Sequence, residues 1–413
     1  MKKLIVVAET CCLLMATSLT AWGADAPQFR GPERDGKFAE SGLLKTWPET
    51  GPALLWKKEG VGKGYGSAAV VGGIAYVPGM ADDNQGYLYA LDSTGKELWK
   101  ASYGPEILDK QATGSRGTPT VDGDRIYLMS GLGVLSCLSQ KDGAIIWQVD
   151  TLKEFKGEMT QWGMSESPLV DGNKVFATPG GPDASLVALD KMTGKTIWTT
   201  TGFSEPSAYC SPTIFTFGKN RILVTMTAKS VVGIEIETGK VLWTHLHETQ
   251  YDIHAVTPAS EGNTIYYTAV YGSGGGALDV SADGATVTQK WLDENLDCQH
   301  HGVVLHEGYV YGTGHRNNNK LMCLELATGK LMWSTDLVTQ GDVVFADGML
   351  YVYEGPKKGI VTLVKPNPEK FESAGSFTVA AGKDKHWANP TIADGKLYIR
   401  YDGALYAYDI AAK

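Results

Sequence analysis

One short motif recurs along the whole chain and decides what the chain can fold into. Its clearest copies are Ala188–Trp198 (ALDKMTGKTIW), Ala90–Trp99 (ALDSTGKELW) and Cys323–Trp333 (CLELATGKLMW). Looser or partial copies end at Trp56, Trp147, Trp243, Trp291 and Phe371. The eight anchors lie roughly 38 to 51 residues apart, which is typical of repeats that each build one propeller blade.

Each copy predicts a strand, a tight turn and a second strand. Asp190 can accept hydrogen bonds from the amides of the turn, and Gly194 supplies the positive φ that the turn needs. The second strand ends on the tryptophan. A four-stranded blade is apolar on both faces and must pack between two neighbours, so we expect each indole to act as a wedge between blades.

The two ends of the chain predict how the ring closes. The last blade stops at Ala404–Asp409 without a final tryptophan strand, whereas Leu54–Lys57 is a tryptophan strand without a blade. Joining the two leaves no open sheet edge. No segment shows a sustained helical period. We therefore predict an all-β fold, an eight-bladed β-propeller of four-stranded antiparallel blades, closed by an N-terminal strand in the last blade.

The N-terminus is typical of an export signal. Lys2 and Lys3 precede a mostly apolar run over 4–20, and Ala21 and Gly23 are small residues suited to cleavage after Gly23. We divide the chain into a signal peptide (1–23), an N-terminal strap (24–50) and a single propeller (51–413). This predicts a periplasmic or secreted protein, and no later stretch reaches transmembrane length.

Charge and cysteine content narrow the classes of partner. The formal net charge is −9 without long runs of one sign, which argues against nucleic acid and anionic membrane surfaces. Beyond the predicted signal, we interpret the cysteines as buried free thiols: Cys137, Cys210, Cys298 and Cys323.

The repeat resembles the PQQ-type propeller family, in which quinoprotein alcohol and sugar dehydrogenases stand beside the propeller subunit of the outer-membrane β-barrel assembly machinery. Four further stretches look like an exported bacterial subgroup described as PQQ-like or as relatives of polyvinyl-alcohol dehydrogenase: Pro27–Pro32, Gly62–Ser67, Trp162–Pro168 and His300–Gly302. The resemblance covers almost the whole predicted mature chain, and it implies the fold. Function does not follow from it, because this fold carries unrelated activities.

The resemblance also implies pyrroloquinoline quinone (PQQ) as a cofactor, yet two departures count against it. Alcohol-oxidising members usually carry adjacent cysteines and a calcium site near the quinone. The only adjacent cysteines here, Cys11 and Cys12, lie in the predicted signal, and no cluster of acids and amides has calcium spacing. The sequence leaves the cofactor unknown.

Polar residues precede the first strand of most blades, and those strands line a propeller's central channel. As catalytic candidates we select an imidazole or phenol base and a cation to steady an anion, namely His254, His301, Arg116 and Tyr209. As ligand-binding candidates we select Tyr65, Glu166, His300, Asp342, Trp387 and Asn389. The structural alternative is that these side chains bond the channel's own backbone and water.

No metal site is predicted. His300 and His301 are adjacent, and neighbours on a strand point to opposite faces, so they cannot simply share one ion. Three functions remain open: binding of a polar small molecule or carbohydrate in the central funnel, with or without catalysis there; PQQ-dependent oxidation of alcohols or sugars; and a scaffold for envelope proteins in outer-membrane assembly. The sequence does not decide whether the protein is an enzyme.

Overall fold

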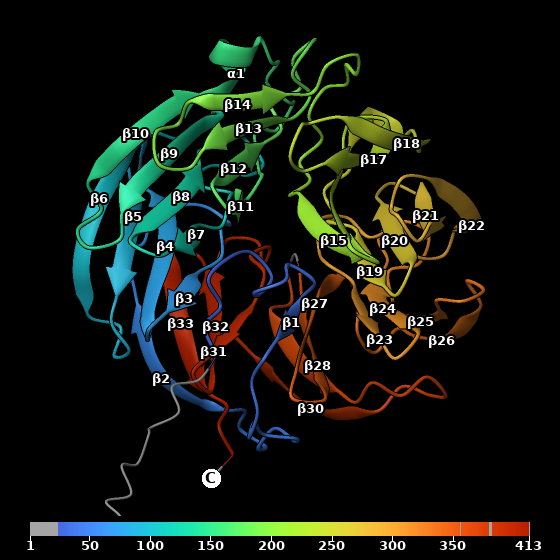
Figure 1. Ribbon diagram of the computed structural model, residues 1–413. Helices are drawn as coiled ribbons and strands as arrows, with labels where there is room; N and C mark the ends of the chain where they lie inside the picture. The colour runs from blue at the N-terminus through green and yellow to red at the C-terminus, as the bar shows by residue number, and fades with distance from the viewer. Residues whose placement is uncertain (1–23, 356, 380–381, 413) are drawn as a thin grey trace, which may run out of the picture.

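Each predicted repeat forms one antiparallel sheet, and in the computed structural model eight such sheets stand around a common axis (Figure 1). The structure describes residues 24–355, 357–379 and 382–412. The predicted signal peptide, 1–23, lies outside these ranges. Within them helical structure is confined to α1 (Thr151–Phe155) and the 3₁₀ turn η1 (Gln250–Asp252), and no helix is long and apolar enough to span a bilayer.

The first four blades follow the chain in order. Blade 1 is β3 (Ala69–Val71), β4 (Ile74–Met80), β5 (Gln85–Leu91) and β6 (Glu97–Pro105); blade 2 is β7 (Thr120–Asp122), β8 (Arg125–Met129), β9 (Val134–Ser139) and β10 (Ile145–Asp150). Blade 3 is β11 (Leu169–Asp171), β12 (Lys174–Ala177), β13 (Val187–Asp190) and β14 (Thr196–Thr199); blade 4 is β15 (Thr213–Phe217), β16 (Asn220–Met226), β17 (Ser230–Glu235) and β18 (Val241–Leu246).

The remaining blades include the two that take up N-terminal strands. Blade 5 is β19 (Ala259–Glu261), β20 (Thr264–Ala269), β21 (Gly274–Val280) and β22 (Val287–Asp293); blade 6 is β23 (Val304–His306), β24 (Tyr309–Thr313), β25 (Leu321–Glu325) and β26 (Leu331–Thr335). Blade 7 is β27 (Gly341–Ala346), β28 (Met349–Glu354), β29 (Ile360–Val364) and β30 (Ser373–Thr378), with β1 (Lys37–Phe38) added; blade 8 is β31 (Thr391–Ala393), β32 (Lys396–Tyr401), β33 (Ala404–Asp409) and β2 (Ala53–Lys58).

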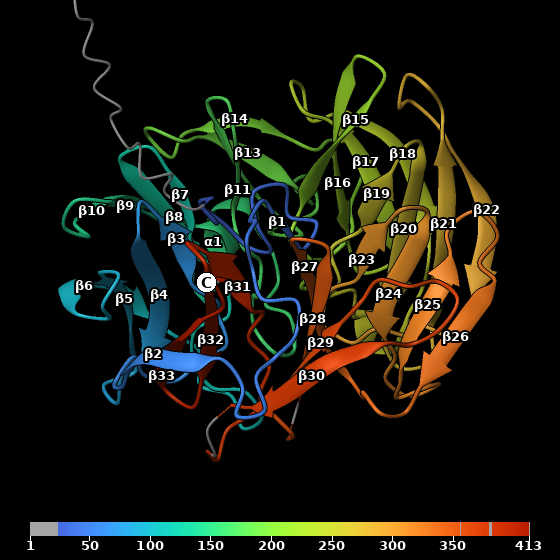
Figure 2. The same cartoon turned by 90° about the horizontal axis from the view of Figure 1, so that it is seen from below.

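The ring closes as predicted, because β2 supplies the outermost strand of blade 8. It pairs antiparallel with β33, from Ala53 opposite Asp409 to Lys58 opposite Leu405 (Figure 2). The first strands of neighbouring blades lie against one another, for example β3 against both β7 and β31. These short first strands therefore surround the channel, and the tryptophan strands lie at the rim.

The tryptophans lie between blades, where the repeat predicted them. The Trp198 indole donates to the Ile236 carbonyl of the next blade at 2.9 Å, and the Trp56 indole donates to Ser93 of blade 1 at 3.0 Å. Glycine is required in the facing turns, because a Cβ on Gly194 (φ 73°) would lie 2.8 Å from the Trp147 ring. The aspartate and glycine of the motif thus shape a turn on which the preceding indole docks.

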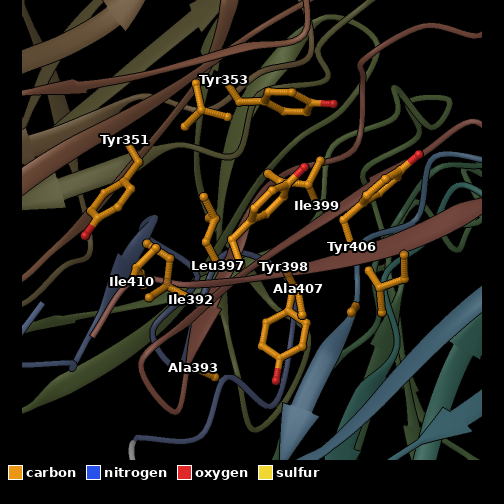
Figure 3. Close-up of a cluster of buried hydrophobic side chains, with 14 of the residues drawn as sticks. Tyr351, Tyr353, Ile392, Ala393, Leu397, Tyr398, Ile399, Tyr406, Ala407 and Ile410 are labelled. Carbon is orange, nitrogen blue, oxygen red and sulfur yellow. The ribbon is translucent and has the colours of Figure 1, made fainter. Parts of the chain in front are cut away.

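The last blade shows how continuous the inter-blade packing is. Residues of β31, β32 and β33 form one buried cluster with side chains of blades 7 and 1 (Figure 3). Tyr351 and Tyr353 enter this cluster from β28, and Trp47 packs edge-on against Tyr351 at 5.7 Å between ring centroids. The four described cysteines are buried and free, as expected.

The N-terminal segment crosses the channel, which the sequence did not predict. Ala26 pairs with Val70 of blade 1, and Pro27 accepts from Val121 of blade 2. From the same segment β1 runs parallel to β27 of blade 7 (Figure 1). Residues 26–38, which we call the channel segment, therefore contact blades on both sides of the axis.

Two arginines anchor the channel segment. The Arg30 guanidinium forms a buried ion pair with Asp342 at 2.7 Å and donates to the Val303 carbonyl at 2.8 Å. Arg34 donates to the carbonyls of Ser167 and Pro168 in blade 3, at 2.6 and 2.9 Å. One short peptide thus links blades 3, 6 and 7 through buried cations.

Candidate functional site

A cavity of about 200 Å³ lies where the blade-opening segments converge. Seven of the eight blades contribute the segment just before their first strand, and the channel segment contributes Phe29. The lining comprises Phe29, Tyr65, Ser67, Gln111, Ala112, Arg116, Thr118, Trp162, Ser165, Tyr209, Ser211, Ile253, Ala255, Val270, Tyr271, Gln299, His300, Trp387 and Asn389. Arginines of the same segment are tied to blades 3, 6 and 7, so the Phe29 side chain is held at this cavity by the anchored channel segment.

The lining follows the two-residue alternation of extended backbone. In five openings, residues n and n+2 line the cavity and residue n+1 does not: 65 and 67, 116 and 118, 209 and 211, 253 and 255, and 387 and 389. Glycine occupies the intermediate position in the first two. A Cβ on Gly66 would lie 2.4 Å from the Gly117 carbonyl oxygen, so neighbouring openings approach each other too closely for a side chain there.

The structure brings together six of the ten predicted site residues, namely Tyr65, Arg116, Tyr209, His300, Trp387 and Asn389. Glu166 and His254 do not join them: His254 stands between the lining residues Ile253 and Ala255, and Glu166 directly follows the lining residue Ser165. Glu166 Oε2 accepts from the Thr178 amide at 2.8 Å, and His254 Nδ1 lies 2.8 Å from the Thr227 carbonyl. Both side chains are buried behind the lining, which corrects their predicted convergence with Arg116.

His301 and Asp342 also lie outside the cavity. Asp342 pairs with Arg30 and accepts from the Gly302 amide at 2.9 Å, so its contacts are those of an anchor for the channel segment. His301 is buried, with its ring 4.0 Å from that of His300 between centroids. The two histidines precede β23 in a bend and not in a strand, so the premise that their side chains point to opposite faces does not hold.

Small hydroxyl residues at the openings bond the channel's own backbone, which is the structural role that the sequence left open for residues at these positions. The Ser67 amide donates to Thr118 Oγ1 at 3.1 Å, the Thr118 amide to Ser167 Oγ at 2.9 Å, and the Ser167 amide to Ser211 Oγ at 2.9 Å. Each hydroxyl thus accepts from the backbone of the preceding blade. These residues hold the openings in register around the channel.

Several polar atoms of the larger lining residues are buried and have no hydrogen-bond partner. They are Arg116 Nε, His300 Nε2, Trp387 Nε1 and Asn389 Oδ1. Leaving a buried polar group unpaired costs about 1–3 kcal/mol. Three different blades, 2, 6 and 8, therefore bring residues with unpaired polar atoms to the lining of one small cavity.

Aromatic rings form two walls of the cavity. On one side Trp387 lies 5.3 Å from Tyr65 and 4.8 Å from His300 between ring centroids. On the other side Trp162 lies 6.1 Å from Tyr209. Rings alternating with unpaired donors suit a ligand that has both apolar faces and hydroxyl edges.

Burial sets the protonation of the titratable groups. It lowers the pKa of His300 and of His254 to about 3, so both imidazoles are neutral at pH 7. Burial also lowers the pKa of Arg116, against the opposing charge of Asp109, but an arginine stays protonated in proteins. At neutral pH the lining carries one formal charge, that of Arg116, since it contains no lysine, aspartate or glutamate.

Burial raises the pKa of Glu166 to about 8, an effect that Arg34 opposes. Between about 4.3, the pKa of an exposed glutamate, and that value, the folded protein holds a proton that the unfolded chain releases. This group's contribution to stability is therefore full at low pH and is lost as the pH rises to 8. We therefore expect the free energy of unfolding of Glu166→Gln, measured in urea and compared with that of wild type, to be more favourable at pH 8.5 than at pH 5 by at least about 1 kcal/mol. A difference independent of pH would contradict this assignment.

Sequence reasoning missed the lining residues that come from loops and from the channel segment. Gln111, Trp162 and Tyr271 precede no first strand, and Phe29 is far from the repeats. Trp162 carried a usable signal, because it is a tryptophan outside the repeat period. Phe29 carried none, since its position depends on the arginine contacts of the channel segment.

The lining does not fit a calcium-assisted quinone cofactor. Calcium requires several oxygen ligands, usually including carboxylates, and the cavity lining contains no aspartate or glutamate. It contains no cysteine either, and each described cysteine is single and buried. Within the described ranges, no group of three or more His, Cys, Asp or Glu side chains is arranged to hold a metal ion.

Comparison with known proteins places this fold in a family. The sequence profile of the family described as outer membrane protein assembly factor BamB matches residues 84–335 and 276–412. The assembly factor BamB of Yersinia pestis is 22% identical over 288 residues, covering 67% of this chain and 58% of the relative. The polyvinylalcohol dehydrogenase of a Sphingopyxis species is 22% identical over 336 residues, covering 73% of this chain and 44% of the relative.

The chain thus spans about half the length of these curated relatives. Among solved structures, the quinohemoprotein alcohol dehydrogenase of Comamonas testosteroni superposes with a TM-score of 0.66 at 13% identity, covering 94% of this chain and 81% of that one. At this identity the likeness shows the propeller fold alone.

Proposed function

The chain belongs to the family described as outer membrane protein assembly factor BamB, and within that family we propose that it is an exported propeller that binds a carbohydrate or a similar polar small molecule. The ligand would occupy the central cavity that the blade openings and Phe29 line. The observation that carries this proposal is that four residues with buried, unpartnered polar atoms line one aromatic-walled cavity, namely Arg116, His300, Trp387 and Asn389.

Carbohydrate is the ligand class that this combination favours. A pyranose ring presents apolar C–H faces that stack on indole and phenol rings, and hydroxyl groups that both donate and accept. The cavity is smaller than the roughly 300–1,000 Å³ of sites for drug-sized ligands, which suits a ligand of one or two rings. Its walls are supported by the backbone around the channel, so little would have to reorder on binding.

We expect Trp387→Ala to weaken saccharide binding by at least about 10-fold, because it removes both a stacking face and the Nε1 donor. The measurement is isothermal titration calorimetry of the mature protein against mono- and disaccharides selected by thermal-shift screening. Tyr87→Ala is the matched control, since Tyr87 is an aromatic residue of β5 outside the cavity. Equal affinities for wild type and Trp387→Ala would contradict the cavity as the binding site.

Catalysis in the cavity remains a narrower proposal. Of the four predicted catalytic residues, Arg116 and Tyr209 line the cavity, and His254 and His301 lie behind it. His300 is the imidazole that lines the cavity, and its Nε2 has no partner. Quinone-dependent alcohol oxidation, for which a relative is named, is not favoured by a lining without carboxylates or cysteines.

A second candidate function is a scaffold for envelope proteins, as the family's description suggests. The observation that favours it is the exposure of apolar side chains on the outermost strands of seven of the eight blades. Blades 8 and 1 to 6 present Leu54, Leu55, Leu98, Ile145, Ile146, Ile197, Leu246, Leu292 and Leu331. Binding of purified outer-membrane assembly components, lost when several of these residues are changed to serine, would support this function.

A further inference from the structure

We propose that the ligand of the cavity carries a single carboxylate, which Arg116 binds, so that the preferred ligand is an acidic sugar such as a hexuronate. This inference rests on the proposed function, because it names the class of carbohydrate that the same cavity takes. It follows from the charge of the lining and from the hydrogen bonds that Arg116 makes and does not make.

The lining is electrostatically one-sided. Arg116 carries the one formal charge among the residues that line the cavity, and no acidic residue of the lining balances it. The side chain of Arg116 is only 10% exposed, so water compensates the charge weakly. A neutral sugar would shed its own water on entering and would leave this charge with only the distant Asp109 carboxylate, 4.0 Å away, to compensate it.

The nearby acids are engaged elsewhere. Asp109 Oδ1 lies 4.0 Å from Arg116 Nη2, but the same oxygen accepts from the amides of Gln111 and Ala112, at 2.8 Å each. Asp384 Oδ1 accepts from the Tyr65 hydroxyl at 2.7 Å. Glu106, whose charge like that of Asp109 opposes the lowering of the Arg116 pKa by burial, accepts from the Tyr103 hydroxyl at 2.7 Å. None of these carboxylates lines the cavity, so none fills the place of a ligand.

Arg116 is held in place with a donor to spare. One guanidinium nitrogen, Nη2, donates to the Ala112 carbonyl, which fixes the side chain against its own loop. The Nε–H is buried and has no partner. A planar guanidinium that is anchored at one edge and unpaired at another is suited to a carboxylate, which accepts charge-assisted hydrogen bonds.

The other unpaired groups call for uncharged partners. Trp387 Nε1 can only donate, Asn389 Oδ1 can only accept, and His300 is neutral at physiological pH. Hydroxyl groups satisfy all three. A ligand with one carboxylate and several hydroxyls therefore matches the lining atom type by atom type, whereas a polyanion would present more negative charge than the lining neutralises.

The test compares each sugar acid with its own methyl ester, which removes the charge and keeps the ring. We expect glucuronate or galacturonate to bind wild type about 10- to 100-fold more tightly than the ester, the range given by one charge-assisted hydrogen-bonded pair. In Arg116→Gln this ratio should fall to about 1, and in Arg116→Lys it should be intermediate. Arg221→Gln, which alters an arginine paired with Asp171 outside the cavity, should keep the wild-type ratio.

The outcomes separate this inference from the function on which it rests. Equal binding of acid and ester, unchanged in Arg116→Gln, would overturn the carboxylate assignment and leave carbohydrate binding in place. If wild type binds neither the sugar acids, nor their esters, nor any other sugar, the proposed function itself is overturned. Binding of pyrroloquinoline quinone that depends on Arg116, with no sugar bound, would overturn both and return the cavity to a quinone.

Discussion

We expect deletion of residues 24–58 to abolish the single cooperative unfolding transition of the propeller. The deletion removes β2, the outermost strand of blade 8, and exposes the full edge of β33. It also removes Trp56, whose ring packs on the Gly95 turn of blade 1. Blades 8 and 1 would then face each other without their shared wedge, and a ring cannot stay closed with one interface missing.

Deletion of residues 24–52, which keeps β2, is the matched control. Both variants lose the channel segment, so the difference between their urea-unfolding curves reports the closing strand alone. A synthetic peptide of residues 51–60 added to the longer deletion should restore a cooperative transition by pairing with β33. Two deletions that unfold at the same urea concentration would show that β2 does not close the ring.

The second large effect is expected from Arg30→Met, which should lower the free energy of unfolding by about 3–5 kcal/mol. The change leaves Asp342 buried and without its cation, in a region where its side chain is only 1% exposed. It also withdraws the hydrogen bonds that Arg30 donates to the carbonyls of Val303 and Val343. Chemical unfolding at pH 7 measures this loss.

A double-mutant cycle distinguishes the ion pair from general packing. In Arg30→Met/Asp342→Asn the asparagine carries no charge, and its Oδ1 can still accept from the Gly302 amide. The double variant should therefore be clearly more stable than the sum of the two single changes predicts. Strictly additive losses would mean that the pair contributes nothing beyond its separate contacts.

The fold was predictable because its determinants are local and repeated. Asp190, Gly194 and Trp198 lie within nine residues of one another, and the same triplet of turn acceptor, positive-φ residue and indole recurs in other blades. Closure was predictable for a different reason. An incomplete blade at one end and a spare strand at the other leave one way to pair every edge.

The candidate site was only half predictable, for a physical reason visible in Glu166 and His254. At a blade opening both alternating faces are enclosed, one by the cavity and one by the blade interface, so polarity does not reveal which residue faces the cavity. Glu166 is polar and yet its side chain lies outside the cavity and bonds the Thr178 amide, whereas Ile253 is apolar and lines the cavity. Small hydroxyl residues such as Thr118 would show which of the two alternating sets of residues faces the channel.

The channel segment was not predictable at all. Its course depends on Arg30 and Arg34 meeting carbonyls contributed by distant blades, and neither arginine belongs to a repeat or a periodic pattern. An isolated arginine in a proline-containing stretch is also common at exposed sites. Only the assembled ring offers the inward-pointing carbonyls that make burying these cations favourable.

The channel segment also imposes an order of events on biosynthesis. Arg30 precedes every blade in the chain, and its partner Asp342 is translated 312 residues later. At ribosomal speeds of 5–20 residues per second that interval is about 15–60 s. During that time the channel segment lacks its partners in the later blades, and the incomplete ring of blades exposes an unpacked face at each end. A nascent chain of this design must be kept apart from its neighbours until its last blade arrives, and it then closes around a segment that was made before any of its blades.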